Sequence, residues 1–302
     1  MKRRQEKRNV IVGTAVRPNA GIRAWYRAVL RALVDDMAEK TKKRILRVYR
    51  KYQKQILPRP AAMDANISSR AEAELRELQN QIEDEFRKKA RKISEQFVSR
   101  TQKYASSTTK DSIKGMLNDA AWAGFTVKKA SISESMAAVL KASLYENVAL
   151  IKDLPEKYFN AVSGAVYRNI AAGETSGAIE KALSYCGRIA QRRAELIARD
   201  QSQKAFEALS REHMKAAGIT HFEWVATGGG LYPRELHHTH VSHGGLNHGI
   251  YSFDNPPIIQ EAYIPKTPRG TARGPIRGFP GDLPYCQCIK RPVLIMDNNK
   301  VL

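Results

Sequence analysis

Apolar residues recur at three- and four-residue steps through much of the first two thirds of this 302-residue chain. Between residues 22 and 56 the stripe includes Trp25, Leu30, Val34 and Met37, and Arg and Lys fill many of the positions between them. This spacing gathers the apolar side chains on one face of a helix and the charged ones on the other. It predicts an extended helical region at the start of the chain.

The pattern continues through several further segments. Residues 70–104 are charge-rich with a narrow apolar stripe, which is typical of a helix that packs on a partner helix, and Ser68 or Ser69 is expected to cap it. Further helices are predicted after it. One or two cover residues 111–152, one runs from Leu154-Pro155 to Gly173, and one runs from Thr175 or Ser176 through Leu183. The last covers about 188–216 and is ended by Gly218.

The character of the chain changes after Gly218. His221–Val225 alternates like a strand, residues 254–284 are rich in Pro and Gly, and residues 292–295 predict a final strand. We therefore predict a mainly α protein: an extended helical N-terminal region, then a small α+β C-terminal domain with a long Pro/Gly-rich loop. The predicted parts are a flexible basic arm over 1–20, a helical, charge-rich region over 21–150 and a C-terminal domain over 151–302.

The net charge of +21 is concentrated at the N-terminus, where the first 56 residues hold 17 Lys and Arg against four Asp and Glu. Such a surplus predicts a polyanionic partner bound through counterion release; the alternative is a solvated arm that keeps the protein soluble. Contacts to phosphates position a protein on double-stranded DNA without reading its sequence. The candidate phosphate-binding residues are Lys2, Arg3, Arg4, Lys7, Arg8, Lys42, Lys43, Arg44, Arg47 and Arg50.

Metal-binding residue types cluster near the C-terminus. All seven histidines fall between His213 and His248, and two of the three cysteines form the triplet Cys286-Gln287-Cys288. On alternate positions of an extended chain both thiols point the same way, and two thiolates with two imidazoles make a tetrahedral zinc site. The candidate ligands are His237, His243, Cys286 and Cys288; the alternative is that the cysteines are small apolar core residues.

Other classes of protein fit the sequence less well. Three cysteines make no disulfide framework, which favours a reducing compartment. The first 20 residues lack the apolar stretch of a signal peptide, and no apolar run of about 18 residues predicts a membrane span. Arg199-Asp200 lies within the last predicted helix, and together with Arg234 it is expected to be a structural clamp that hydrogen-bonds a neighbouring segment.

A series of short motifs follows residue 150. They are, in order, Ala194–Gln201, Ala216–Ile219, Trp224, Pro233–His237, His243–Asn247 with Gly249, Pro256-Pro257, Pro280-Gly281 and Cys286–Cys288. In this order they resemble the C-terminal domain of the phage Mu F-like minor head proteins, also called phage head morphogenesis proteins. The chain departs from the family pattern in a longer segment after the Arg-x-x-His motif, so that His237 and His243 compete for one role, and in Gln287, where the family usually has Arg.

The resemblance implies a structural virion component that is present in few copies and is not an enzyme. Such a protein binds the portal protein and packaged DNA at the portal vertex of the phage head, and supports head assembly and DNA packaging or delivery. The major capsid or a scaffolding protein is a further candidate partner, and the host cytoplasm is the place of assembly. Two alternatives stay open: a metal-dependent nuclease built around His237–His248, and a free DNA-binding protein.

Overall fold

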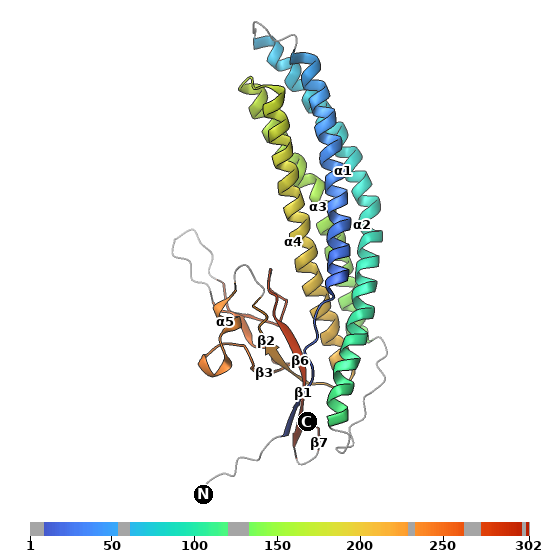
Figure 1. Cartoon of the computed structure of the whole chain (residues 1–302), viewed down its shortest axis with the longest axis vertical. Helices are drawn as coiled ribbons and strands as arrows, with labels where there is room; N and C mark the ends of the chain where they lie inside the picture. Colours follow the sequence, from blue (N-terminus) through green and yellow to red (C-terminus); the bar gives the residue numbers. More distant parts are fainter. Residues whose placement is uncertain are drawn as a thin grey trace. The chain divides into compact units, whose positions relative to one another are not determined.

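The computed structural model describes residues 9–53, 61–119, 133–228, 233–262, 273–297 and 300–301 (Figure 1). Four long helices are followed by a small region with an antiparallel sheet, which confirms the predicted fold class. The chain divides into two compact units, and each is described by itself. The helical unit comprises residues 21–97 and 143–199, and the sheet unit comprises residues 1–20, 98–142 and 200–302.

The first of the four helices matches the predicted segment closely, and the other three are longer than the sequence pattern predicted. Ser68 and Ser69 do not cap a helix but lie inside one, and Pro155 lies within a helix instead of opening it. A proline removes only one amide donor, and the helix continues because Leu154, Tyr158 and other residues on both sides of Pro155 are buried. The helices are α1 (Ala20–Gln53), α2 (Ala61–Asp119), α3 (Glu134–Ala171) and α4 (Ser176–Ala216).

The helix ends predicted at Gly173 and Gly218 and the start predicted at Thr175 or Ser176 are confirmed, whereas the break predicted between Leu183 and residue 188 is wrong because α4 continues through it. Gly173 and Gly218 have positive φ values of 64° and 88°, a left-handed conformation that glycine adopts without steric cost. The side chain of Thr175 accepts a hydrogen bond from the amide of Ala178 at 3.3 Å and so caps α4. Residue 150, the position of the predicted domain boundary, lies inside α3.

In the helical unit, three helices are joined by an aromatic stacking contact and a hydrogen bond to a side-chain amide. Tyr26 of α1 stacks on Phe97 of α2, with ring centroids 4.2 Å apart, and its hydroxyl donates to Asn147 of α3 at 2.7 Å. The ring of Tyr49 is buried and its hydroxyl donates to the carbonyl of Glu174. Tyr49 is therefore a core residue of this unit.

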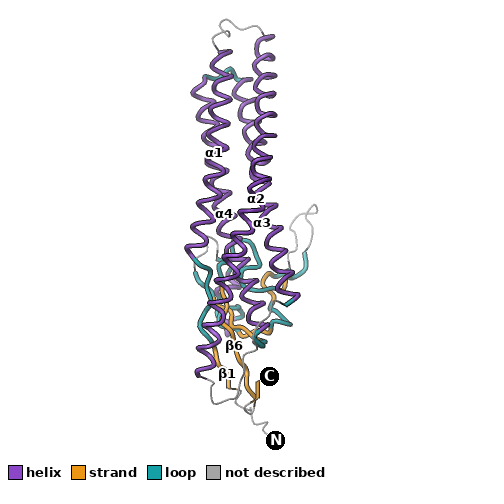
Figure 2. The backbone as a smooth tube through the Cα atoms, turned by 90° about the vertical axis from the view of Figure 1, so that its right-hand side faces the viewer, coloured by secondary structure: helices purple, strands orange, loops and turns teal. Residues whose placement is uncertain are grey.

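The sheet unit contains a five-stranded antiparallel sheet in the order β1-β6-β2-β3, with β7 also paired to β6 (Figure 2). Two short strands, β4 and β5, form a separate pair, and α5 (Glu235–His238) and the 3₁₀ helix η2 (Val241–His243) lie in the loops. The strands are β1 (Asn9–Val12), β2 (His221–Val225), β3 (Ile250–Ser252), β4 (Ile258–Gln260), β5 (Ile276–Arg277), β6 (Ile289–Asp297) and β7 (Lys300–Val301).

Residues 9–16 are not part of a free arm, which corrects the prediction for residues 1–20. The apolar run Val10–Val12 pairs antiparallel with β6, where Val12 lies opposite Val293. Val16 is fully buried and its amide donates to the carbonyl of Lys290 at 3.3 Å. The run is short and follows five basic residues, so the charge pattern obscured its β-propensity. Residues 1–8 lie outside the described residues.

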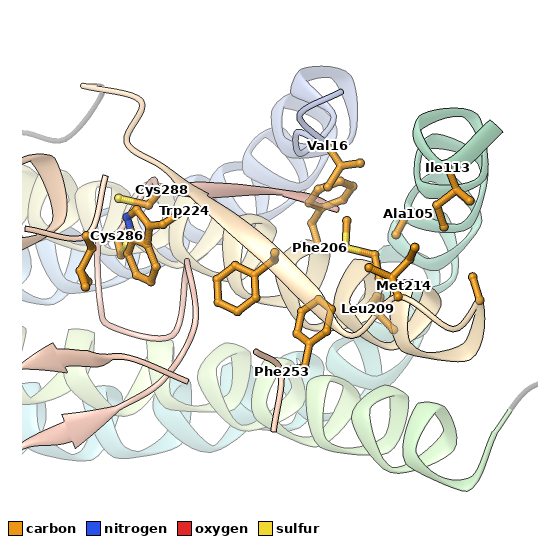
Figure 3. Close-up of a cluster of buried hydrophobic side chains, with 14 of the residues drawn as sticks. Val16, Ala105, Ile113, Phe206, Leu209, Met214, Trp224, Phe253, Cys286 and Cys288 are labelled. Carbon is orange, nitrogen blue, oxygen red and sulfur yellow. The ribbon is translucent and has the colours of Figure 1, made fainter. Parts of the chain in front are cut away.

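Aromatic side chains fill the core of the sheet unit. Phe222 of β2 packs on Phe253 with ring centroids 5.1 Å apart, and Phe206 and Leu209 from the end of α4 belong to the same cluster (Figure 3). This core supports the segment that carries Cys286 and Cys288. Across the described part of the chain, no helix is both long and apolar enough to span a membrane.

Candidate metal centre

His237, Cys286 and Cys288 meet in the interior of the sheet unit. His237 lies on α5, and the two cysteines immediately precede β6. The Nδ1 atom of His237 is 3.5 Å from the sulfur of Cys286 and 3.9 Å from that of Cys288. All three side chains are buried, and the indole of Trp224 lies beside the cysteines (Figure 3). This group can hold a metal ion.

The spacing of these atoms fits a tetrahedral ion. Zinc binds sulfur at about 2.3 Å and imidazole nitrogen at about 2.0–2.1 Å. Tetrahedral angles then place a nitrogen and a sulfur ligand about 3.6 Å apart. The two measured nitrogen–sulfur distances, 3.5 and 3.9 Å, lie on either side of that value. Binding an ion therefore requires little movement of the side chains.

The hydrogen bonding of His237 leaves its Nδ1 atom available to bind a metal ion. Its Nε2 atom lies 2.8 Å from the carbonyl oxygen of Ile259, and a carbonyl can only accept, so Nε2 carries the proton. In a neutral imidazole Nδ1 then holds the lone pair, and Nδ1 is the atom that faces the sulfurs. A ring N–H donated to a backbone carbonyl is the usual support of a metal-bound histidine.

The two thiols are electrostatically unequal. The hydrogen bond from Cys288 lowers the pKa of the Cys286 thiol to about 4, with help from His237 and the backbone amides of Gly281 and Cys288 and against the effect of burial. The hydrogen bond with Cys286 and burial raise the pKa of Cys288. The pair thus stabilises one thiolate and retains one proton, which a divalent cation would displace.

One face of α4 binds the extended segment that leads into β6. Its residues Asp200, Gln203 and Glu207 follow one another at three- and four-residue steps, so they share that face. The carboxylate of Asp200 accepts from the amide of Tyr285 at 2.9 Å, and Gln203 donates to the carbonyl of Cys288 at 2.8 Å. The helix therefore fixes the backbone on both sides of Cys286.

The third contact on this face of α4 is a buried ion pair. Nζ of Lys290 lies 2.5 Å from the Glu207 carboxylate and 2.6 Å from its backbone carbonyl. Burial raises the pKa of Glu207 to about 7 and lowers the pKa of Lys290, while each group's charge opposes the shift of the other. The sequence analysis missed this pair, because lysine and glutamate are among the residues least often buried.

Two of the three predicted clamp residues contact the turn before Cys286. Arg234 donates to the carbonyl of Pro284 at 3.0 Å, so Arg234 and Asp200 both bind the turn before Cys286. Arg199 precedes Asp200 on α4 and belongs to the helical unit. Tyr285, in this turn, has a positive φ of 61°, a conformation that non-glycine residues rarely adopt.

His243 does not belong to the centre, which corrects the predicted ligand set. It lies on the exposed helix η2, where its Nδ1 atom is 3.1 Å from the hydroxyl of Ser242. The four residues of α5 turn His237 inward, whereas the next turn of the chain leaves His243 in solvent. Within the described residues, no fourth histidine, cysteine or carboxylate joins the group.

The basic residues predicted to bind DNA fall into two sets. Lys2, Arg3, Arg4, Lys7 and Arg8 lie outside the described residues. On α1, Lys43 and Arg47 are exposed, whereas Arg44 is bound by Glu74 at 2.7 Å and Glu77 at 2.9 Å. Arg44 therefore joins α1 to α2. Lys42 pairs with Glu39 at 3.1 Å and Arg50 with Glu180 at 3.9 Å, both near the surface.

Comparisons with known proteins give one distant relative. The chain is similar to an uncharacterized protein of Haemophilus influenzae, with 27% identity over 154 residues. The match covers 51% of this chain and 29% of that protein, so the chain spans less than a third of the relative it matches. No family model and no solved structure matches the chain.

Proposed function

We propose that this protein is a structural minor head protein of a tailed bacteriophage, acting at the portal vertex on packaged DNA. The observation that carries the proposal is that residues of the motifs bind one another or the segments between the motifs. Asp200 binds the turn before Cys286, His237 faces both cysteines, and the Asn247 side chain accepts from the amide of Ala226 at 2.9 Å. Motif residues used in this way build the interior of a domain.

The buried centre supports a structural role for a metal. The exposed fractions of His237, Cys286 and Cys288 are 2%, 5% and 1%, so a substrate has no access to an ion held there. We propose zinc as the ion, because thiolate and imidazole donors suit it and structural zinc sites are closed to solvent. A nuclease at this buried centre would need an open coordination position, which a closed site does not offer.

The portal assignment predicts that the protein is found in phage particles. Quantitative mass spectrometry of particles purified from a culture producing the phage that encodes this chain should detect it at a few copies per several hundred copies of the major capsid protein. A deletion of the gene should reduce the yield of DNA-filled heads. Particles of full infectivity that lack the polypeptide would refute the proposal, and complementation by the intact gene is the control.

The DNA contact predicts a steep salt dependence. A protein that neutralises six or more phosphates loses roughly a thousandfold or more in affinity between 50 and 200 mM salt. Fluorescence anisotropy with two unrelated 30-base-pair duplexes should show this loss equally for both, because phosphates carry no sequence information. Replacing Lys2, Arg3, Arg4, Lys7 and Arg8 by Gln should flatten the slope, whereas replacing the paired Arg91 (2.8 Å from Glu95) should not. A preference for one duplex would favour a regulatory DNA-binding protein.

A further inference from the structure

Three large apolar side chains of α4 are exposed on one face of the helical unit. Tyr185, Ile189 and Leu196 have exposed fractions of 58%, 44% and 38%. They follow one another at steps of four and seven residues, so they lie on the same face of the helix. The other side of α4 carries the packing within the unit, since Leu183 and Ala190 there are buried. Apolar residues gathered in an exposed patch mark an interaction site, whereas scattered ones do not.

The exposed stripe has the spacing of a seam between two paired helices. Its positions alternate at four- and three-residue steps, which is the pattern of a heptad repeat. At a rise of about 1.5 Å per residue the seam is about 27 Å long, the length of about five helical turns. The seam positions are Ala178, Ala182, Tyr185, Ile189, Arg192 and Leu196.

Basic side chains line one border of this seam. Lys181, Arg188 and Arg192 are exposed and follow one another at steps of seven and four residues, so they lie on one side of the stripe. The guanidinium of Arg188 lies over the ring of Tyr185, 5.7 Å from its centroid. Within the described part of the chain, none of these three cations forms an ion pair.

The carboxylates near this border already have partners inside the helical unit. Glu180 and Glu195 are the two acidic residues between 176 and 199, and both form ion pairs with arginines of α1. Asp35 of α1 accepts a hydrogen bond from Gln191 at 2.6 Å. In an isologous dimer the same patch of both copies meets. A second copy docking through this face therefore brings no free carboxylate to the basic border.

We propose that this face of α4 binds an amphipathic helix of a partner protein, whose apolar stripe is bordered by Asp and Glu. Its apolar residues bury Tyr185, Ile189 and Leu196, and its acidic residues pair with Arg188 and Arg192. A nucleic acid would satisfy the cations but leave the three apolar side chains in water, so it fits this face less well. The contact requires neither the metal centre nor the phage assignment.

Two designed helical peptides of about four heptads, with Leu at the seam positions, test this surface on the full-length protein. One peptide carries Glu and the other Lys on both sides of the seam, and the like charges keep each peptide from pairing with itself. Fluorescence anisotropy should show that the Glu peptide binds at least about tenfold more tightly than the Lys peptide. Ile189→Ser should weaken binding of the Glu peptide at least about fivefold, and Arg188→Glu/Arg192→Glu should reverse the preference between the peptides.

The matched control is Tyr145→Ala, which removes another exposed aromatic side chain of the helical unit and should leave binding of the Glu peptide unchanged. Circular dichroism verifies that each variant is folded. Equal binding of the two peptides, no binding of either, or an Ile189→Ser variant that binds like the wild type would overturn the proposal. A dimer that Ile189→Ser dissociates in light scattering would instead assign the face to a second copy. A DNA duplex that binds the wild type but not Arg188→Glu/Arg192→Glu, while neither peptide binds, would assign it to nucleic acid.

Discussion

Removing the zinc ion proposed for the buried His237–Cys286–Cys288 centre is expected to lower the Tm of the protein by about 8–16 °C. An ion present at a thousand times its Kd stabilises the folded state by about 4 kcal/mol, and each kcal/mol shifts the Tm of a domain of 150–250 residues by about 2–4 °C. The effect is large because the segments that supply the ligands, α5 and the chain before β6, contain little regular structure of their own.

The measurement compares protein dialysed against a weak chelator with protein treated with a strong one. Elemental analysis should find one zinc ion per chain still bound after dialysis against the weak chelator. Differential scanning calorimetry should record the fall in Tm when the strong chelator removes this ion. Cys286→Ser/Cys288→Ser should lose that ion. The matched control is Cys186→Ser, a buried cysteine of the helical unit. Wild-type protein with the same Tm in both chelators would contradict a structural zinc.

The helical fold was predictable from sequence because the stripe of buried residues follows the helix period. Ile82, Phe86, Ile93 and Phe97 are all buried in α2, as their spacing predicted. Helix ends were predictable where a glycine or cap residue marks them, as at Gly173. They were not predictable where packing on both sides overrides a local breaker, as at Pro155, because tertiary contacts are not encoded in a local window.

The candidate centre was predictable in part for a chemical reason. Alternate positions in an extended segment face one way, so Cys286 and Cys288 pointed to a shared site. The same rule extends two residues further, to Lys290, which faces Glu207. The burial of Lys290 was not predictable from the sequence, because a lysine in a basic chain is usually a surface residue. The choice between His237 and His243 rested on the path of a loop, which residue type and spacing do not determine.

Lys290→Met is expected to destabilise the protein by about 3–5 kcal/mol, which corresponds to a fall in Tm of about 6–20 °C. The exposed fractions of the Lys290 and Glu207 side chains are 0% and 1%, so Met leaves a carboxyl group without its partner in the interior. Oε1 of Glu207 has no hydrogen-bond partner among the described residues, and the substitution removes the bond to Oε2 as well. The group must then be protonated or hydrated by opening the core.

A double-mutant cycle separates this pair from ordinary packing. Lys290→Met/Glu207→Leu should recover most of the lost stability, since an apolar pair of similar volume often replaces a buried ion pair without loss. The matched control is Lys40→Met, whose partners Asp36 and Glu85 lie near the surface and whose loss should cost at most about 1 kcal/mol. Urea unfolding of the wild type, Lys290→Met, Glu207→Leu and the double variant yields the coupling free energy. If Lys290→Met cost no more than Lys40→Met, the contact between α4 and β6 would have to rest on Gln203 and the apolar core, and the ion pair would contribute no net stability.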